Sequence, residues 1–426
     1  MGADSPSERR AVTPSHPTTT TPVVRTDIQG LRALAVSLVL IYHLAPDSLT
    51  GGYVGVDVFF VISGFLITLH LLGRIPRSGR DLVGFWSRRV RRLLPASLLV
   101  LASTLVASRI WAPETQWANT ARHARAATLY VVNWVLSGEV DYQHAEDAAS
   151  PVQHFWSLSV EEQFYFVWPV LILLLGLLAR RLGRENRLHV VLAGLVMVVA
   201  ASLAYSIHIT GTNPSAAYFV TPARVWELGI GGILACIVLL ATGHQHHEEH
   251  RHRAVRDTLR PEIAVPLAWL GFAAIAYAAV TFTEDTPFPG WHAAIPVLGT
   301  AAVIGAQSTQ GTGSPGNLLA LRPVQWLGDV SYSVYLWHWP LVVIVPQATG
   351  HDLTWTDRGS IALATLALAA LTKTYVEDRF RGASWGVPLP KPFAIAGLAM
   401  TVVIAGAAVQ LHESDQLAAD ARVARE

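Results

Sequence analysis

Ionisable side chains interrupt apolar stretches of this 426-residue sequence, where a charged group is costly to bury. Arg32 and His43 begin and end one such stretch, RALAVSLVLIYH. Their spacing of about three helical turns places both on one face of a helix, roughly 16 Å apart along its axis. An arginine binds anions and a histidine accepts a proton near neutral pH. The pair therefore predicts two chemical functions connected by one helix face.

Carboxylates in later apolar stretches are candidates for the same chemistry. Asp57, in GGYVGVDVFF, has a predicted depth similar to that of His43. A carboxylate beside an imidazole orients a general base, although a buried pair that only joins two helices would look the same in the sequence. Glu161 and Glu162, in FWSLSVEEQFYFVWP, enter a later span from the same predicted outer side. We therefore predict that these ionisable groups converge on the outer half.

Two further motifs combine polar and aromatic residues. Arg224 precedes a glutamate by three positions in TPARVWELG, so the two charges partly neutralise each other. Tyr332, Tyr335 and His338 recur every three residues and form one polar, aromatic stripe. A stripe of this kind lines a cavity, whereas an interfacial aromatic belt would place its tyrosines at the ends of the span.

A cluster of arginines occupies the sequence FWSRRVRRLLP. Its members are Arg88, Arg89, Arg91 and Arg92. Membrane topology, attraction to anionic lipid and bidentate binding of phosphates each explain such a cluster. Composition leaves these explanations open.

The elements that carry these residues are membrane helices. Hydrophobic residues make up 52% of the chain and charged residues 14%, and the mean hydropathy is +0.38. A net charge of +1 disfavours a nucleic-acid partner, and one cysteine excludes a disulfide framework and a cysteine-ligated metal centre. The motifs of serine hydrolases, NTP-driven pumps, zincins and dinucleotide enzymes are missing from the sequence.

Apolar runs long enough to cross a bilayer predict an all-α, polytopic protein with about eleven transmembrane helices. They lie near 30–46, 53–73, 93–111, 158–179, 189–208, 219–241, 263–283, 291–307, 329–347, 358–376 and 393–411. An excess of Lys and Arg in alternate loops favours the N-terminus inside and the C-terminus outside. The short apolar run 126–136 then does not cross, and 112–157 becomes an outer segment with a re-entrant or interfacial helix.

The predicted organisation has four parts. Residues 1–24, rich in Ser, Thr and Pro, form a disordered cytoplasmic tail, 25–382 a membrane domain, 383–411 an additional span and 412–426 a short outer tail. The histidine-rich stretch 244–252 is more typical of a solvated loop than of a metal site. We predict no bound metal.

Six motifs in register resemble acyltransferase family 3, the membrane acyltransferases that include bacterial O-antigen and cell-wall O-acetylases. They are RTDIQGLRALAVSLVLIYH, GGYVGVDVFFVISGFLIT, RRVRRLLPA, FWSLSVEEQFYFVWP, RVWELGIGG and LGDVSYSVYLWHWPL. The resemblance implies transfer of an acyl group, often acetyl, from cytoplasmic acyl-CoA to a hydroxyl of an envelope glycan, glycolipid or similar acceptor. It also implies a multi-pass protein of a bacterial inner membrane, in contact with membrane lipid.

The resemblance assigns roles to the motif residues. His43 is the expected general base, or a covalent carrier of the acyl group. Arg32, Asp57, Glu161 and Glu162 are expected to support it. The arginine cluster is expected to bind the phosphates of acetyl-CoA or another acyl-CoA. Expected acceptor contacts come from Trp156, Arg224, Tyr332, Tyr335 and His338.

Two departures from the family pattern stand near the end of the resemblance. Many relatives carry an I-E-K-P-like sequence where this chain has YVEDRF, which keeps Glu377 but replaces Lys-Pro by Asp378 and Arg379. Some relatives also continue after the eleventh span into an SGNH-type domain, so this chain either works alone or lacks that domain.

Two other functions are compatible with part of the sequence. A proton-coupled secondary transporter of an envelope precursor would use the same intramembrane charges, although inverted repeats are not visible. A membrane scaffold gives no reason to bury so many ionisable groups. Acceptor identity, acyl length and oligomeric state stay open.

Overall fold

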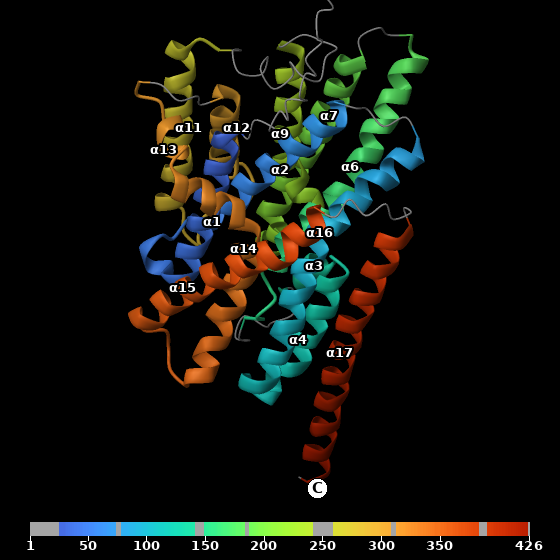
Figure 1. Cartoon of the computed structure of the whole chain (residues 1–426), viewed down its shortest axis with the longest axis vertical. Coiled ribbons are helices and arrows are strands. Elements are labelled where there is room, and N and C mark those ends of the chain that lie inside the picture. The colour runs from blue at the N-terminus through green and yellow to red at the C-terminus, as the bar shows by residue number, and fades with distance from the viewer. Residues whose placement is uncertain are drawn as a thin grey trace, which may run out of the picture.

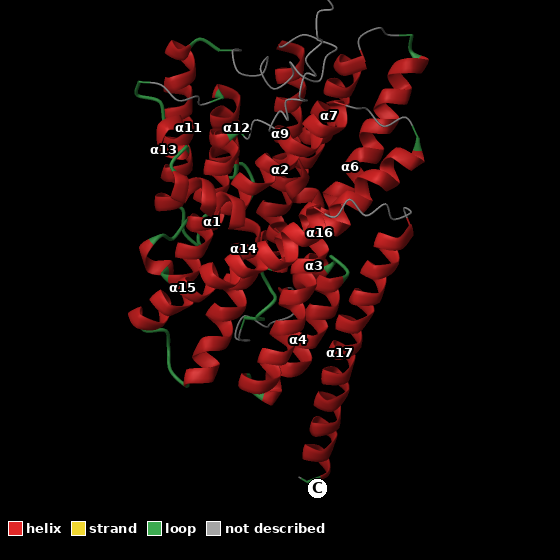
Figure 2. Cartoon of the chain, viewed as in Figure 1, coloured by secondary structure: helices red, strands yellow, loops and turns green. Residues whose placement is uncertain are grey.

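The computed structural model describes residues 25–73, 78–140, 149–183, 187–241, 259–307, 312–382 and 390–424. Within these ranges the chain is helical and has no β-strand, which confirms the predicted all-α class (Figure 2). A helix satisfies its own backbone N–H and C=O groups, so apolar sequence in a bilayer folds this way. The predicted tail 1–24 and the histidine-rich stretch 244–252 lie outside the described residues.

Nine helices of the described chain are long and apolar enough to cross a membrane. They are α1 (Thr26–Leu44), α2 (Gly55–Gly73), α3 (Gly79–Trp111), α6 (Phe155–Arg181), α7 (Arg187–Thr212), α9 (Thr221–Ala241), α11 (Pro261–Thr281), α15 (Trp355–Thr372) and α17 (Pro390–Val423). Between them lie α4 (Glu114–Thr128), α5 (Val132–Val140), α8 (Pro214–Phe219), α12 (Ala294–Ala306), α13 (Gly316–Leu319), α14 (Arg322–Thr349) and α16 (Asp378–Gly382). The polytopic class predicted from the sequence is confirmed.

The two other predicted spans, 291–307 and 329–347, correspond to α12 and α14. The 13 residues of α12 extend about 20 Å, which is less than a hydrocarbon core of about 30 Å. The 28-residue α14 is long enough to cross a bilayer, but the polar residues of its stripe lower its mean hydropathy, so it does not count as a span by composition. Apolar length alone therefore identifies nine spans in the described chain, and the eleven-span arrangement with the N-terminus inside stays a prediction.

Helices α2 and α9 pack closely near the middle of the bundle (Figure 1). A Cβ atom on Gly64 would lie 1.8 Å from the carbonyl oxygen of Leu228, and one on Gly231 would lie 2.1 Å from that of Val61. Only glycine permits such an approach, as is common where membrane helices cross. This contact places Asp57 on α2 and Arg224 on α9 within reach of each other.

The connection between α4 and α5 turns back into the bundle. Residues 126–136 do not form one helix, because α4 ends at Thr128 and α5 starts at Val132. Buried Asn133 donates from Nδ2 to the carbonyl oxygen of Phe219 at 3.1 Å. Gln163 on α6 donates to the carbonyl oxygen of Tyr130 at 2.8 Å. The described part of the segment 112–157 is thus mostly helical and bonded to the bundle, and its re-entrant or interfacial position in the membrane stays a prediction.

Helix α17 packs along α3 and α4 and extends beyond the other helices at the C-terminal end (Figure 1). Arg109 on α3 pairs with Glu413 on α17 at 2.7 Å. The helix continues to Val423, so residues 412–423 of the predicted outer tail are helical, and their location outside stays a prediction. The predicted span 393–411 was chosen by hydropathy, which does not detect a helix that continues with polar residues.

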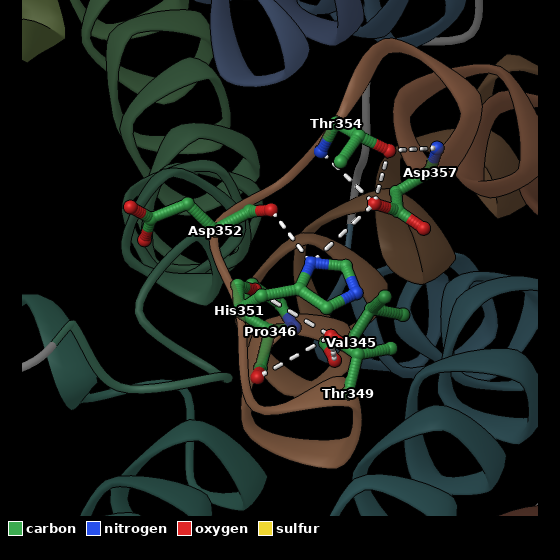
Figure 3. A network of polar contacts seen from close by, with 7 residues as sticks. All are labelled: Val345, Pro346, Thr349, His351, Asp352, Thr354 and Asp357. Atoms are coloured by element: carbon green, nitrogen blue, oxygen red, sulfur yellow. Dashed lines mark hydrogen bonds and ion pairs between the residues drawn. The ribbon is translucent and has the colours of Figure 1, made fainter.

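The turn between α14 and α15 is held by a capping box (Figure 3). The Thr354 hydroxyl accepts from the backbone N–H of Asp357 at 3.3 Å, and the Asp357 carboxylate accepts from the backbone N–H of Thr354 at 2.9 Å. Exposed His351 lies beside them, with Nδ1 3.8 Å from Asp357 Oδ2. Capping of this kind directs α15 back along α14.

Candidate active site

A cavity of about 380 Å³ lies between α1, α2, α3, α6 and α14. Its ionisable lining comprises Arg32, His70, Arg88, Arg89, Arg92, Glu161 and Glu162. Its apolar and aromatic lining includes Val56, Phe59, Phe60, Leu158, Tyr332 and Tyr335. The cavity extends along α2 between two ends, because the ring of Phe85 on α3 lies 6.2 Å from that of His70 near the end of α2, whereas the Tyr335 ring lies 6.3 Å from that of Phe59 near its start.

The arginine end is held by aromatic and acidic partners. The Arg89 guanidinium lies 3.6 Å from the centre of the Tyr165 ring, and Glu162 lies in electrostatic range of Arg89 and Arg92. Glu161 accepts hydrogen bonds from the hydroxyls of Ser63 and Tyr165. The two glutamates therefore lie with the arginine cluster, and their convergence with His43 on the outer half stays a prediction. Helix α3 brings the cluster deeper into the bundle than a surface loop would.

His43 and His338 form a separate pair beyond the other end of the cavity. His338 Nδ1 lies 2.6 Å from the carbonyl oxygen of Tyr335, and a carbonyl only accepts, so this nitrogen carries the hydrogen. The Nε2 of a neutral His338 is then an acceptor, 3.0 Å from His43 Nδ1. His43 Nδ1 must donate, which leaves His43 Nε2 with a free lone pair. The geometry therefore holds half-buried His43 in the tautomer that a base requires.

A third histidine supports this pair. Buried His154 donates from Nε2 to the carbonyl oxygen of Leu336 at 3.1 Å, and its ring centre lies 5.5 Å from that of His338. Burial, reinforced by His338 and His43, holds the pKa of His154 well below its ordinary value. His154 is consequently neutral at physiological pH and adds no positive charge beside His43.

Asp57 has a different partner from the one predicted. Arg224 donates from Nη2 to Asp57 Oδ1 at 2.9 Å, and Arg224 Nε lies 3.1 Å from Glu227 Oε1 as an ion pair without hydrogen-bond geometry. All three side chains are at most 1% exposed. His43 is oriented by His338, and Asp57 neutralises a buried arginine. The prediction that Asp57 orients His43 is wrong because the α2–α9 contact brings Arg224 to it.

Two of the predicted acceptor contacts are buried in this ion network. The Arg224 guanidinium lies 5.5 Å from the ring centres of both Phe60 and Trp156 and 5.3 Å from that of Phe288. Neither Arg224 nor Trp156 is among the described residues that line the cavity. This geometry favours a structural role for both.

The remaining predicted residues divide between the two regions. Tyr332 and Tyr335 line the cavity, whereas His338 from the same stripe contacts His43. Arg32 lines the cavity with the arginine cluster. Arg91 is absent from the lining, and its Nε donates to the Ser87 carbonyl oxygen at 3.4 Å. These positions leave the proposed roles of the residues untested.

Sequence reasoning missed several residues at the site, namely Ser63, Tyr130, His154, Ser157 and Tyr165. Each lies within or next to a quoted motif or the re-entrant segment, but none is charged at neutral pH, so the search for buried charge passed over them. Tyr130 has a backbone φ of +54°, which is uncommon for a residue with a side chain and is visible only in the structure. It lines the cavity, and its hydroxyl lies 3.0 Å from that of Ser97.

The departure YVEDRF has a structural explanation. Residues Lys373–Glu377 form a π-helical turn, in which buried Glu377 accepts a hydrogen bond from the Ser333 hydroxyl. Asp378 pairs with Lys373 Nζ at 2.6 Å. The aspartate that replaces the relatives' lysine is thus neutralised by a lysine five positions earlier. In the part of the chain that the structure describes, three or more His, Cys, Asp or Glu residues nowhere gather as a metal site would require.

A polytopic helical bundle with an arginine-lined cavity beside a histidine pair has the architecture of a membrane-embedded group-transfer enzyme. The chain belongs to the acyltransferase family whose model, described as "Acyltransferase domain" (Acyl_transf_3), matches residues 25–374. This match confirms the resemblance found in the sequence.

Individual relatives support the assignment. The O-acetyltransferase OatA of Staphylococcus aureus (strain NCTC 8325) is 35% identical over 324 residues, which cover 75% of this chain and 50% of OatA. The peptidoglycan O-acetyltransferase OatA of Listeria monocytogenes is 31% identical over 361 residues, or 83% of this chain and 55% of the relative. YrhL of Bacillus subtilis is 32% identical over 362 residues. The chain spans about half the length of these relatives, and no solved structure shows significant similarity to it.

Proposed function

We propose that this chain is an O-acetyltransferase of the cell envelope that moves an acetyl group from acetyl-CoA to a hydroxyl of a glycan such as peptidoglycan. The observation that carries the proposal is the cavity itself, whose guanidinium groups suit the phosphates of an acyl-CoA and whose other end lies next to the histidine pair. The name of the Listeria monocytogenes relative, a peptidoglycan O-acetyltransferase, supports peptidoglycan as the acceptor. The location is the plasma membrane of a bacterium.

Arg88, Arg89 and Arg92 bind the donor phosphates in this proposal. The arginine planes offer bidentate hydrogen bonds, and Tyr165 keeps the Arg89 plane in position. The uncharged acyl-pantetheine arm extends along the apolar lining towards Tyr335. Glu161 and Glu162 compensate the arginine charge before the donor binds.

His43 activates the acceptor. Its Nε2 takes the proton of the acceptor hydroxyl while the hydroxyl oxygen attacks the thioester carbonyl carbon. The carbon–sulfur bond breaks, the ester forms, and the proton passes from His43 to the departing thiolate, which leaves as the CoA thiol. A positioned base of this kind contributes about 10²- to 10⁴-fold to the rate.

Release of CoA from acetyl-CoA by purified protein in nanodiscs tests this function, with soluble peptidoglycan oligosaccharides as acceptors. We expect His43→Ala to lose at least about 100-fold of the release rate at unchanged donor affinity. We expect Arg89→Ala combined with Arg92→Ala to weaken donor binding, because two cationic contacts to phosphate are lost.

Arg180→Ala combined with Arg181→Ala is the matched control, because this pair lies at the end of α6 and outside the cavity lining. Absence of acetyl-CoA binding to the native protein would overturn the proposal and favour a transporter. Full activity of the His43 variant would overturn the assigned base.

A further inference from the structure

A hydrogen bond between Tyr335 and Ser157 lies where the arginine cavity ends. The two hydroxyl oxygens are 2.5 Å apart, and the Tyr335 hydroxyl also donates to the carbonyl oxygen of His154 at 3.0 Å. Both side chains are buried and both line the cavity. The bond therefore joins α14 to α6 across this end of the cavity.

The histidine pair lies on the other side of this bond. His338 follows Tyr335 by about one helical turn on α14, and neither His338 nor His43 is among the described residues that line the cavity. The backbone of Tyr335 faces the pair, because its carbonyl oxygen accepts from His338 Nδ1 at 2.6 Å. One residue thus closes the cavity with its side chain and fixes the histidine tautomer with its backbone.

We infer that Tyr335 and Ser157 form a closure that separates the acyl-donor cavity from the histidine base until the tyrosine side chain moves. This inference rests on the proposed function, since it concerns the same donor and the same base. In the closed structure a thioester in the cavity cannot meet a hydroxyl held at His43. Transfer requires the Tyr335–Ser157 bond to open.

The closure protects the donor from water. His43 is half-buried, so water reaches the base, whereas Tyr335 and Ser157 are 6% and 4% exposed and lie between the base and this end of the cavity. A base that deprotonates an acceptor hydroxyl also deprotonates water. Water attack would break the carbon–sulfur bond, form acetate and return a proton to the CoA thiolate, so the acetyl group would be lost without transfer.

Two variants open the closure in different ways. Tyr335→Phe removes the hydroxyl that bridges Ser157 and His154, and Ser157→Ala removes the other partner while the tyrosine stays. The matched controls are Tyr277→Phe, at an exposed position on α11, and Ser159→Ala on α6. Neither residue lines the cavity, and the Ser159 hydroxyl donates to the carbonyl oxygen of Phe155 in its own helix at 3.0 Å.

The experiment measures acetate formed from acetyl-CoA over many turnovers in nanodiscs without acceptor, and the ratio of acetate to transferred acetyl with acceptor. We expect both variants to raise the hydrolysis rate about two- to tenfold, because the loss of one net hydrogen bond shifts the equilibrium between the closed and open states by that factor. Both controls should match the native rate. Adding His43→Ala to Ser157→Ala should abolish the extra hydrolysis. A purely structural bond would leave the ratio unchanged.

Native transfer with unchanged hydrolysis in both variants would overturn the closure alone. Extra hydrolysis that survives His43→Ala would also overturn it, because the water would then not be activated by this base. Failure of the native protein to bind acetyl-CoA would instead overturn the proposed function. Should Tyr335→Phe fold poorly, Ser157→Ala alone decides the outcome.

Discussion

His338 offers a direct test of how the base is held, because the sequence predicted that it contacts the acceptor whereas the geometry makes it the partner of His43. His338→Phe keeps an aromatic ring but removes the nitrogen that accepts from His43 Nδ1 at 3.0 Å. Without that acceptor the His43 hydrogen is no longer held on Nδ1, and in the tautomer that carries it on Nε2 this nitrogen cannot accept a proton. His338→Gln retains an acceptor oxygen in the same direction.

The expected loss follows from the cost of the unmade bond. An N–H left without a partner on a buried side costs about 1–3 kcal/mol, which corresponds to a decrease in kcat of about 5- to 150-fold. This is less than the effect of removing the base, about 10²- to 10⁴-fold. We therefore expect His338→Phe to lie between native and His43→Ala, with His338→Gln recovering part of the loss.

Steady-state transfer of acetyl to the soluble acceptor separates the two roles. A positioning role lowers kcat at nearly unchanged acceptor KM, whereas an acceptor contact raises that KM. His351→Phe is the control, because this exposed histidine lies in the α14–α15 turn (Figure 3). A His338→Phe protein with native kcat and a raised acceptor KM would refute the orientation of His43 by His338.

Two other predictions concern the buried charges and the base. Asp57→Ala leaves the Arg224 charge short of a partner. We expect a loss of about 3–5 kcal/mol in the free energy of unfolding, measured by denaturation in detergent, and a partial recovery when Arg224→Leu is added. Equal stability of the single variant and the native protein would contradict the network. The transfer rate at saturating donor should fall as the pH is lowered below the ordinary titration range of a histidine, about pH 6.5, because protonated His43 cannot accept a proton; a rate that stays flat down to the lowest pH at which the protein remains folded would argue against a histidine base.

Local properties of the sequence were sufficient for the fold class and for most of the candidate residues. Apolar length predicted the nine helices of the described chain that are long and apolar enough to cross a membrane, because a helix in a bilayer needs only its own backbone hydrogen bonds. The cost of burying charge identified Arg32, His43, Asp57 and the glutamate pair before any contact was known. The run 126–136 was likewise predicted not to form one span, and in the structure it is divided between α4 and α5.

The partners of these residues were decided by tertiary structure. Hydrophobicity does not choose which faces of membrane helices meet, because lipid is as apolar as the neighbouring helix, and small residues and polar contacts make that choice. Gly64 and Gly231 bring Asp57 to Arg224, and α3 carries Arg89 to the glutamates of α6. The bonds from His43 to His338 and from Ser157 to Tyr335 each join residues far apart in the chain. Spacing along one helix determines which side chains share a face, but only the packing of several helices determines what that face meets.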